Sequence, residues 1–224
     1  MSLFPIIPPA PVVPVTVSQT ASGTSTTNGT VFTFSSLSLG TVKAGRIIGV
    51  FAGGGGPTVG ARDITSLTVA GSAAANVLTA NSSTHNHYSM EMFDIVDATN
   101  STGDIVVTFN NTMDQCLVLV YAIQNANPAT SATATDIDTS GTDTASLTMT
   151  IKENGISVGA AYGNQSRTHV WTGIDEDTEI TINDVVASGA SKAFSTLQTN
   201  LTHTATPSST VSWIMLGTAA YEPA

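Results

Sequence analysis

The chain has 224 residues and a formal net charge of −10, from 6 Lys and Arg against 16 Asp and Glu. Only 10% of its residues are charged, against about 25% in an ordinary domain. Six cations cannot form the clustered basic surface that binds nucleic acid, and one cysteine excludes a disulfide framework. No apolar run is long enough for a membrane-spanning helix. Hydrophobic residues at 41%, together with 36 Thr and 24 Ser, indicate a β-rich chain with a packed core.

The first 17 residues contain five prolines between positions 5 and 14 and no Lys or Arg. A secretory signal needs a basic start and an uninterrupted apolar stretch, so this segment does not resemble one. Closely spaced prolines favour an extended arm. Its large apolar side chains favour docking on a neighbouring subunit over a flexible tail, and we expect them to be the assembly anchor: Leu3, Phe4, Ile6, Ile7, Val12 and Val13. A Ser/Thr/Gly-rich linker at 18–29 completes the predicted arm region, residues 1–29.

From residue 30 onward apolar side chains alternate with a period of two, which is typical of half-buried strands. Clusters of Gly, Asn, Asp, Ser and Pro separate these runs at the spacing of a sandwich or barrel. The predicted strands are 30–35, 46–52, 64–70, 87–96, 104–110, 115–123, 145–151, 155–162, 168–173, 179–182, 192–199 and 210–221. No segment shows a sustained helical stripe. The sequence therefore predicts an all-β, antiparallel, jelly-roll-like β-sandwich.

Residues 115–123 form the most hydrophobic run of the chain. Alternation along a strand places Leu117, Leu119 and Tyr121 on one face and the intervening valines on the other. We expect both faces to be buried, as in a central strand. Cys116 in the same run is expected to be an inert core residue.

Two segments resemble each other: 41–53, TVKAGRIIGVFAG, and 150–163, TIKENGISVGAAYG. Residues 30–224 are predicted to be a single sandwich domain, with pseudo-repeated halves at 30–125 and 142–224 each supplying one sheet. Chance similarity between two β-rich segments of like composition is the alternative interpretation.

The sequence contains no nucleophile elbow, phosphate-binding loop or zinc-binding helix motif. We therefore expect no enzymatic activity and no cofactor. The glycine run 53–56 is interpreted as a mobile loop where another backbone comes close. His85 and His87 have a spacing that metals use on a strand, but without further ligands nearby they are more simply surface histidines.

Acidic residues cluster at 175–179, with a smaller pair at Asp136 and Asp138. Carboxylates on a loop can hold Ca²⁺, but neither segment has the glycine-containing calcium-loop pattern. We expect solvated acidic loops and no bound metal. Of the two tryptophans, Trp213 lies in an apolar run and is predicted to be core, whereas Trp171 is the candidate for an exposed glycan contact.

Two segments carry a resemblance to known proteins. One is an early strand preceded by glycine, KAGRIIGV at 43–50, and the other is a closing apolar strand with a short tail, WIMLGTAAYEPA at 213–224. Together with the apolar arm, they resemble the virion structural proteins of tailed bacteriophages, of the capsid-decoration, head-spike or tail-surface type. The resemblance implies a non-enzymatic homotrimer that contacts the major capsid or tail protein on the outside of the particle. A charge of −10 fits that location because it repels packaged nucleic acid. A glycan- or receptor-binding module on a virion or bacterial surface is the alternative.

Overall fold

The computed structural model describes residues 11–57, 60–81, 88–140 and 144–224. Within these ranges the chain forms seventeen β-strands and no helix, which confirms the all-β prediction. The described residues thus include no helix that could cross a membrane.

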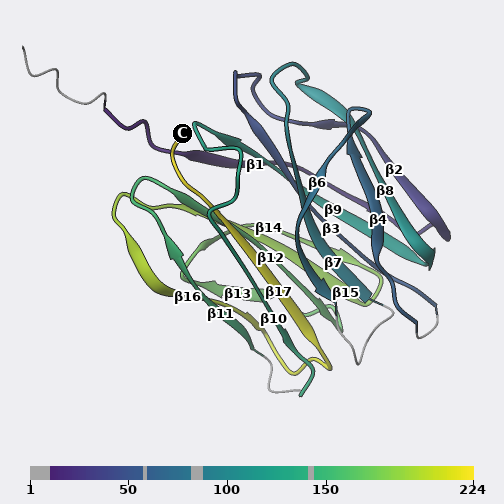
Figure 1. The fold of residues 1–224 in the computed structure, drawn as a ribbon. Helices are drawn as coiled ribbons and strands as arrows, with labels where there is room; N and C mark the ends of the chain where they lie inside the picture. The colour runs from purple at the N-terminus through teal and green to yellow at the C-terminus, as the bar shows by residue number, and fades with distance from the viewer. Residues whose placement is uncertain (1–10, 58–59, 82–87, 141–143) are drawn as a thin grey trace, which may run out of the picture.

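The N-terminal half forms two antiparallel sheets (Figure 1). Its inner sheet has the order β1-β9-β3-β7-β6 and its outer sheet the order β2-β8-β4-β5. The strands are β1 Thr16–Ser25, β2 Gly29–Ser38, β3 Ile47–Gly55, β4 Ile64–Val69, β5 Ser72–Ala73, β6 Ala75–Asn81, β7 Tyr88–Val96, β8 Thr102–Met113 and β9 Gln115–Gln124.

The C-terminal half repeats this arrangement. Its inner sheet has the order β10-β17-β12-β15-β14 and its outer sheet the order β11-β16-β13. The strands are β10 Ala132–Asp138, β11 Ala145–Ile151, β12 Ile156–Asn164, β13 His169–Thr172, β14 Asp175–Ile182, β15 Val185–Ala193, β16 Gln198–Pro207 and β17 Ile214–Tyr221. The two inner sheets therefore have the same strand order. In each, the first and last strands of the half are neighbours. The third strand follows, and then two later strands in reverse order, β7-β6 in one half and β15-β14 in the other.

The two segments that resemble each other in sequence also share a local structure. Each is a turn before a central strand, closed by a backbone hydrogen bond from Arg46 to Lys43 in one half and from Gly155 to Lys152 in the other. The residue before each donor has a positive φ, 70° at Gly45 and 59° at Asn154. Glycine and asparagine are the residues that adopt this conformation most readily, which explains why each turn carries one of them.

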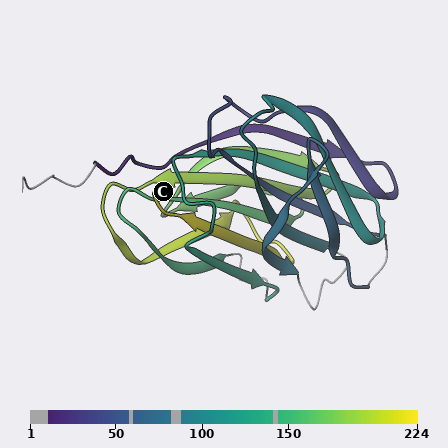
Figure 2. The same cartoon turned by 45° about the horizontal axis from the view of Figure 1, so that its top comes forward.

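The four sheets stack face to face, with the two inner sheets in the middle (Figures 1 and 2). One hydrophobic cluster fills the space between the sheets of the N-terminal half, and two smaller clusters fill that of the C-terminal half. The largest cluster lies between the inner sheets and joins the halves. The β-sandwich is confirmed, with one difference: each half closes two sheets by itself instead of supplying one sheet of a shared sandwich.

Strand β9 lies inside this stack and is the buried central strand that the sequence predicts. Leu117, Leu119 and Tyr121 belong to the cluster between the halves, while Val118 and Val120 belong to the core of the N-terminal sandwich. Both faces are buried, so the predicted alternation is confirmed. Cys116 is also fully buried, and burial raises the pKa of its thiol, which keeps it protonated.

Four predicted loops are strands. The acidic pair Asp136 and Asp138 lies on β10 and pairs with β17, so the loop predicted there is wrong. The predicted linker at 18–29 is wrong for its first part, because β1 pairs along β9 at the edge of the inner sheet. The acidic segment 175–179 belongs to β14, an edge strand that pairs with β15. Gly53–Gly55 continue β3 and are buried. The close backbone approach expected there is present, since a Cβ added at Gly54 would lie 2.6 Å from the carbonyl oxygen of Gln115.

Candidate functional site

The predicted assembly anchor is only partly described. Leu3, Phe4, Ile6 and Ile7 lie outside the described residues. Val12 and Val13 are described and are 60% and 59% exposed. With Pro11, Asn125 and Ala224 they line a shallow hollow of about 340 Å³ where the arm leaves the body. Two adjacent valines thus face water at the root of the arm.

Trp171 is half-buried and packs between the sheets of the C-terminal half. Its ring is partly buried against the two core clusters there, and its indole N–H donates to Ser188 Oγ at 2.9 Å. The predicted glycan contact at Trp171 stays a prediction, and only part of the ring is exposed for it. Trp213 is 1% exposed, as predicted for a core residue.

The predicted metal candidates do not form a site in the described part of the chain. His85 and His87 lie outside it. The acidic pair on β10 is used locally, since Asp136 accepts from the backbone N–H of Ser146 and Asp138 from that of Ser140. Among the described residues no group of three His, Cys, Asp or Glu side chains is arranged to hold a metal ion.

Most buried polar side chains have structural partners. The Arg46 guanidinium donates to the carbonyl oxygens of Asp97, Gly40 and Asn100 at 2.5–2.9 Å. These bonds tie together the loops at one end of the N-terminal sandwich. Glu91 on β7 is 3% exposed and accepts from the backbone N–H of Ile64 at 2.8 Å. Desolvation raises the pKa of its carboxyl despite these bonds.

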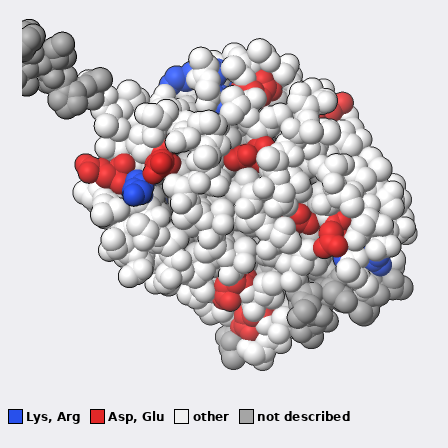
Figure 3. Space-filling model, in the orientation of Figure 1, with Lys and Arg blue, Asp and Glu red and all other residues white. Residues whose placement is uncertain are grey.

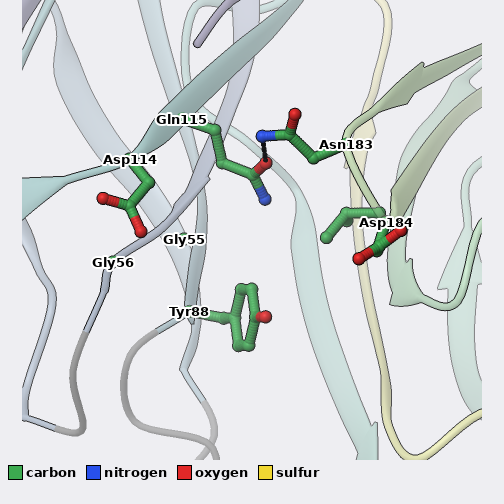
Figure 4. A pocket seen from close by; sticks show the side chains of 8 residues that line it. Gly55, Gly56, Tyr88, Asp114, Gln115, Asn183 and Asp184 are labelled. Carbon is green, nitrogen blue, oxygen red and sulfur yellow. Dashed lines mark hydrogen bonds between the residues drawn. The ribbon is translucent and has the colours of Figure 1, made fainter. Parts of the chain in front are cut away.

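A cavity of about 180 Å³ lies at the junction of the two halves, and Figure 4 shows its walls. The N-terminal half contributes the ends of three adjacent strands, and the C-terminal half contributes the turn between β14 and β15. The lining residues are Gly55, Gly56, Tyr88, Asp114, Gln115, Asn183, Asp184 and Val185. We call this space the seam cavity.

Hydrogen bonds across the junction fix one wall of the seam cavity. Asn183 Nδ2 donates to Gln115 Oε1 at 2.7 Å, and Gln115 Nε2 lies 3.4 Å from the hydroxyl of Tyr162. The Tyr88 ring packs on Trp213, with 4.3 Å between the ring centroids. The amide and aromatic side chains are therefore held in place by both halves of the chain.

The remaining lining side chains make the seam cavity acidic. Asp114 and Asp184 lie on opposite sides of Tyr88 in Figure 4. Burial and then the charges of Asp184 and Asp114 raise the pKa of the Tyr88 hydroxyl. The ion pairs between described residues are Arg46–Asp97 and Lys192–Asp175, and neither of them includes Asp114 or Asp184.

Sequence reasoning missed this cavity for a physical reason. Its acidic residues stand alone in their segments, and only the packing of one half on the other brings Asp114 near Asp184. The one available signal is the Asn183-Asp184 pair, a favoured turn dipeptide; Asn183 has a φ of 50°.

The sequence matches no protein-family model, and no curated protein is significantly similar to it. The function must therefore be inferred from the fold, the seam cavity and the surface. The face seen in Figure 3 is largely uncharged.

Proposed function

We propose that this protein is a non-enzymatic structural component of a bacteriophage particle. It lies on the outside of the capsid or on the tail and assembles as a homotrimer against the major capsid or tail protein. Its N-terminal arm and its charge-poor surfaces make the contacts. The exposed pair Val12 and Val13 carries this proposal.

Val12 and Val13 are adjacent and both face water, so together they offer an apolar contact to a partner surface. Fully burying such a side chain contributes about 1.5–3 kcal/mol. The apolar residues upstream, Leu3, Phe4, Ile6 and Ile7, would extend that contact. Proline fixes φ, so ordering a proline-rich arm on a neighbour costs less entropy than ordering a flexible one.

The low charge supports assembly in a second way. Subunit interfaces have cores depleted in charged residues, because burying an unpaired charge is costly. With 10% charged residues, this chain can bury much of its surface in contacts at low desolvation cost. A glycan- or receptor-binding module, which would use Trp171 or loop residues, is the second candidate, and no observation on the described surface favours it over assembly.

The test is the full chain with Val12→Asp and Val13→Asp together. Native mass spectrometry is expected to show a trimer for the natural chain and a monomer for this variant, and particles grown with the variant should lack the protein. The matched control is Val31→Asp, since Val31 is 56% exposed on β2, away from the arm. A natural chain that is monomeric and absent from particles would refute the proposal.

A further inference from the structure

The sequence contains two Asn-Gly pairs, Asn28-Gly29 and Asn154-Gly155, and the fold places them in opposite environments. In this dipeptide the backbone nitrogen of the second residue can attack the side-chain amide of the first, because glycine has no side chain to shield that nitrogen. The attack closes a ring and requires the peptide unit between the two residues to rotate. The surroundings of that unit therefore decide which asparagine reacts.

The peptide unit between Asn154 and Gly155 is fixed at both ends. Its carbonyl oxygen accepts from the backbone N–H of Val15 at 2.9 Å, and its N–H donates to the carbonyl oxygen of Lys152 at 3.0 Å. Gly155 is also buried, and Asn154 is held at a φ of 59°. Rotation of this unit would break both hydrogen bonds, so the fold protects Asn154.

The peptide unit between Asn28 and Gly29 lies in the open. Asn28 is exposed, at the end of the connection 26–28 from β1 to β2. Gly29 is the first residue of β2 and pairs with Met113, and the register shifts before Val31. The end of a strand is where local opening costs least. A Cβ added at Gly29 would have no atom nearer than 3.7 Å, so the backbone has room to turn.

We propose that Asn28 is a self-modification site, at which the folded chain converts a neutral side chain into a carboxylate. The backbone nitrogen of Gly29 gives its proton to hydroxide and attacks Cγ of Asn28. The new bond from that nitrogen to Cγ replaces the bond from Cγ to Nδ2, which takes a proton from water and leaves as ammonia. The resulting cyclic imide takes up one water. Opening at one carbonyl gives aspartate, and opening at the other gives isoaspartate.

The product changes the edge of an outer sheet. β2 is the first strand in the order β2-β8-β4-β5, and charge on an edge strand discourages pairing with another chain. Only 10% of the residues are charged, so one new carboxylate beside this edge is a substantial local change. The inference is independent of the proposed virion function, because the reaction requires only the folded chain and water.

The test is incubation of the full chain at neutral and at mildly alkaline pH, followed by proteolysis and mass spectrometry, with the released ammonia measured alongside. We expect aspartate and isoaspartate at Asn28, formed faster at the higher pH, while Asn154 stays an amide. In guanidinium chloride, where the fold holds neither pair, both asparagines should convert at similar rates. Conversion of Asn154 as fast as that of Asn28 in the folded chain, or conversion of Asn28 only in the denaturant, would overturn the proposal.

The variant Gly29→Ala tests the attacking nitrogen. A methyl group beside that nitrogen should slow ammonia release at Asn28 at least about tenfold, which corresponds to a barrier higher by about 1.4 kcal/mol. The open space at this position should preserve the fold. Thr33→Ala, at an exposed site on the same strand, is the matched control and should react as the natural chain does. An unchanged rate at Asn28 in Gly29→Ala, at an unchanged melting temperature, would also refute the proposal.

Discussion

Leu119 lies at the centre of β9 and faces the C-terminal half across the core that joins the halves. It is fully buried, and a Cβ added at Gly189 of the opposite sheet would lie 3.1 Å from its side chain. Replacing Leu119 with Ala should lower the free energy of unfolding by about 2–5 kcal/mol, because a cavity remains where the side chain was. Urea denaturation measures this loss. Leu197→Ala, at a site 54% exposed, is the control, and a loss below about 0.5 kcal/mol at Leu119 would contradict its central place.

Gly189 is required for a close approach between the halves. An added Cβ would collide with the hydroxyl of Tyr121, which is itself fully buried in the opposing sheet. Gly189→Ala should therefore destabilise the protein by about 1–3 kcal/mol through overpacking. At Gly29 a Cβ would meet only ordinary contacts, the nearest at 3.7 Å. Gly29→Ala should leave the melting temperature nearly unchanged, and equal effects at the two glycines would refute this account.

His203 on β16 is completely buried, and neither ring nitrogen has a hydrogen-bond partner in the part of the chain that is described. Burial lowers its pKa from 6.5 to about 4. Between these values the unfolded chain binds a proton that the folded chain does not, so lowering the pH from 6.5 towards 4 favours unfolding. Burial lowers the pKa of His169 to about 4 as well, and adds to this effect.

The variant His203→Phe isolates this contribution. Its free energy of unfolding, measured against that of the natural chain, should improve steadily as the pH falls from 6.5 towards 4. Comparison with the natural chain is necessary because the raised pKa values of Glu91 and Asp94 act in the opposite direction over part of this range. A difference between variant and natural chain that does not depend on pH would show that His203 does not titrate in this way.

At the scale of elements, the start of β1 marks the boundary between the arm and the folded body. Val15 is 1% exposed, and its backbone N–H donates to the carbonyl oxygen of Asn154 in the other half at 2.9 Å. A chain that begins at Pro14 should keep its melting temperature. A chain that begins at Ser18 loses a buried valine, worth about 1.5–3 kcal/mol, and the start of an edge strand.

Calorimetry of the two truncated chains distinguishes arm from strand. For a protein of this length about 1 kcal/mol shifts the melting temperature by about 2–4 °C, so the shorter chain should melt at least about 3 °C lower. If the chains that begin at Pro14 and at Ser18 had equal melting temperatures, residues 15–17 would belong to the arm and not to the folded body. The boundary matters for the assembly test, because a variant meant to affect the arm alone must lie before Pro14.

The strands that the sequence predicts well are those with an apolar face. Alternation identifies β9 and both of its faces because a buried central strand must be apolar throughout. The sequence of β1 is TVSQTASGTS and that of β14 begins DEDTE; both resemble loops. Each lies at the edge of its sheet, where a strand carries polar and charged residues that limit aggregation. Their strand structure comes from pairing with a neighbour, which periodicity within one segment does not reveal.

The seam cavity is harder to predict from the sequence than any strand. Asp114 follows β8, and Asp184 sits in a turn of the other half. Taken singly, each is an ordinary turn residue. What places them together is the contact between two similar sandwiches, and that contact depends on the shape of the whole apolar surface between them.

At the scale of the whole molecule, the halves share a core instead of being linked as separate domains. The cluster between the inner sheets contains buried residues of both halves, among them Leu119, Tyr121, Tyr162 and Trp213. Polar bonds cross the same junction, including the Tyr221 hydroxyl, which donates to Asp94 at 2.8 Å. Neither inner sheet could be exposed without placing a large apolar surface in water, which is unfavourable.

We therefore predict that the two halves unfold in a single cooperative transition. The ratio of calorimetric to van't Hoff enthalpy should be close to one. Hydrogen exchange should give the same opening free energy for the most protected amides of β8 and β16, which lie in opposite outer sheets. Tyr221→Phe removes a hydrogen bond to a carboxylate, worth about 1.5–3 kcal/mol, and should lower the stability of both outer sheets equally. Two separate transitions, or a loss confined to β16 and its neighbours, would show that the halves fold independently and that the seam cavity belongs to a loose contact instead of a fixed junction.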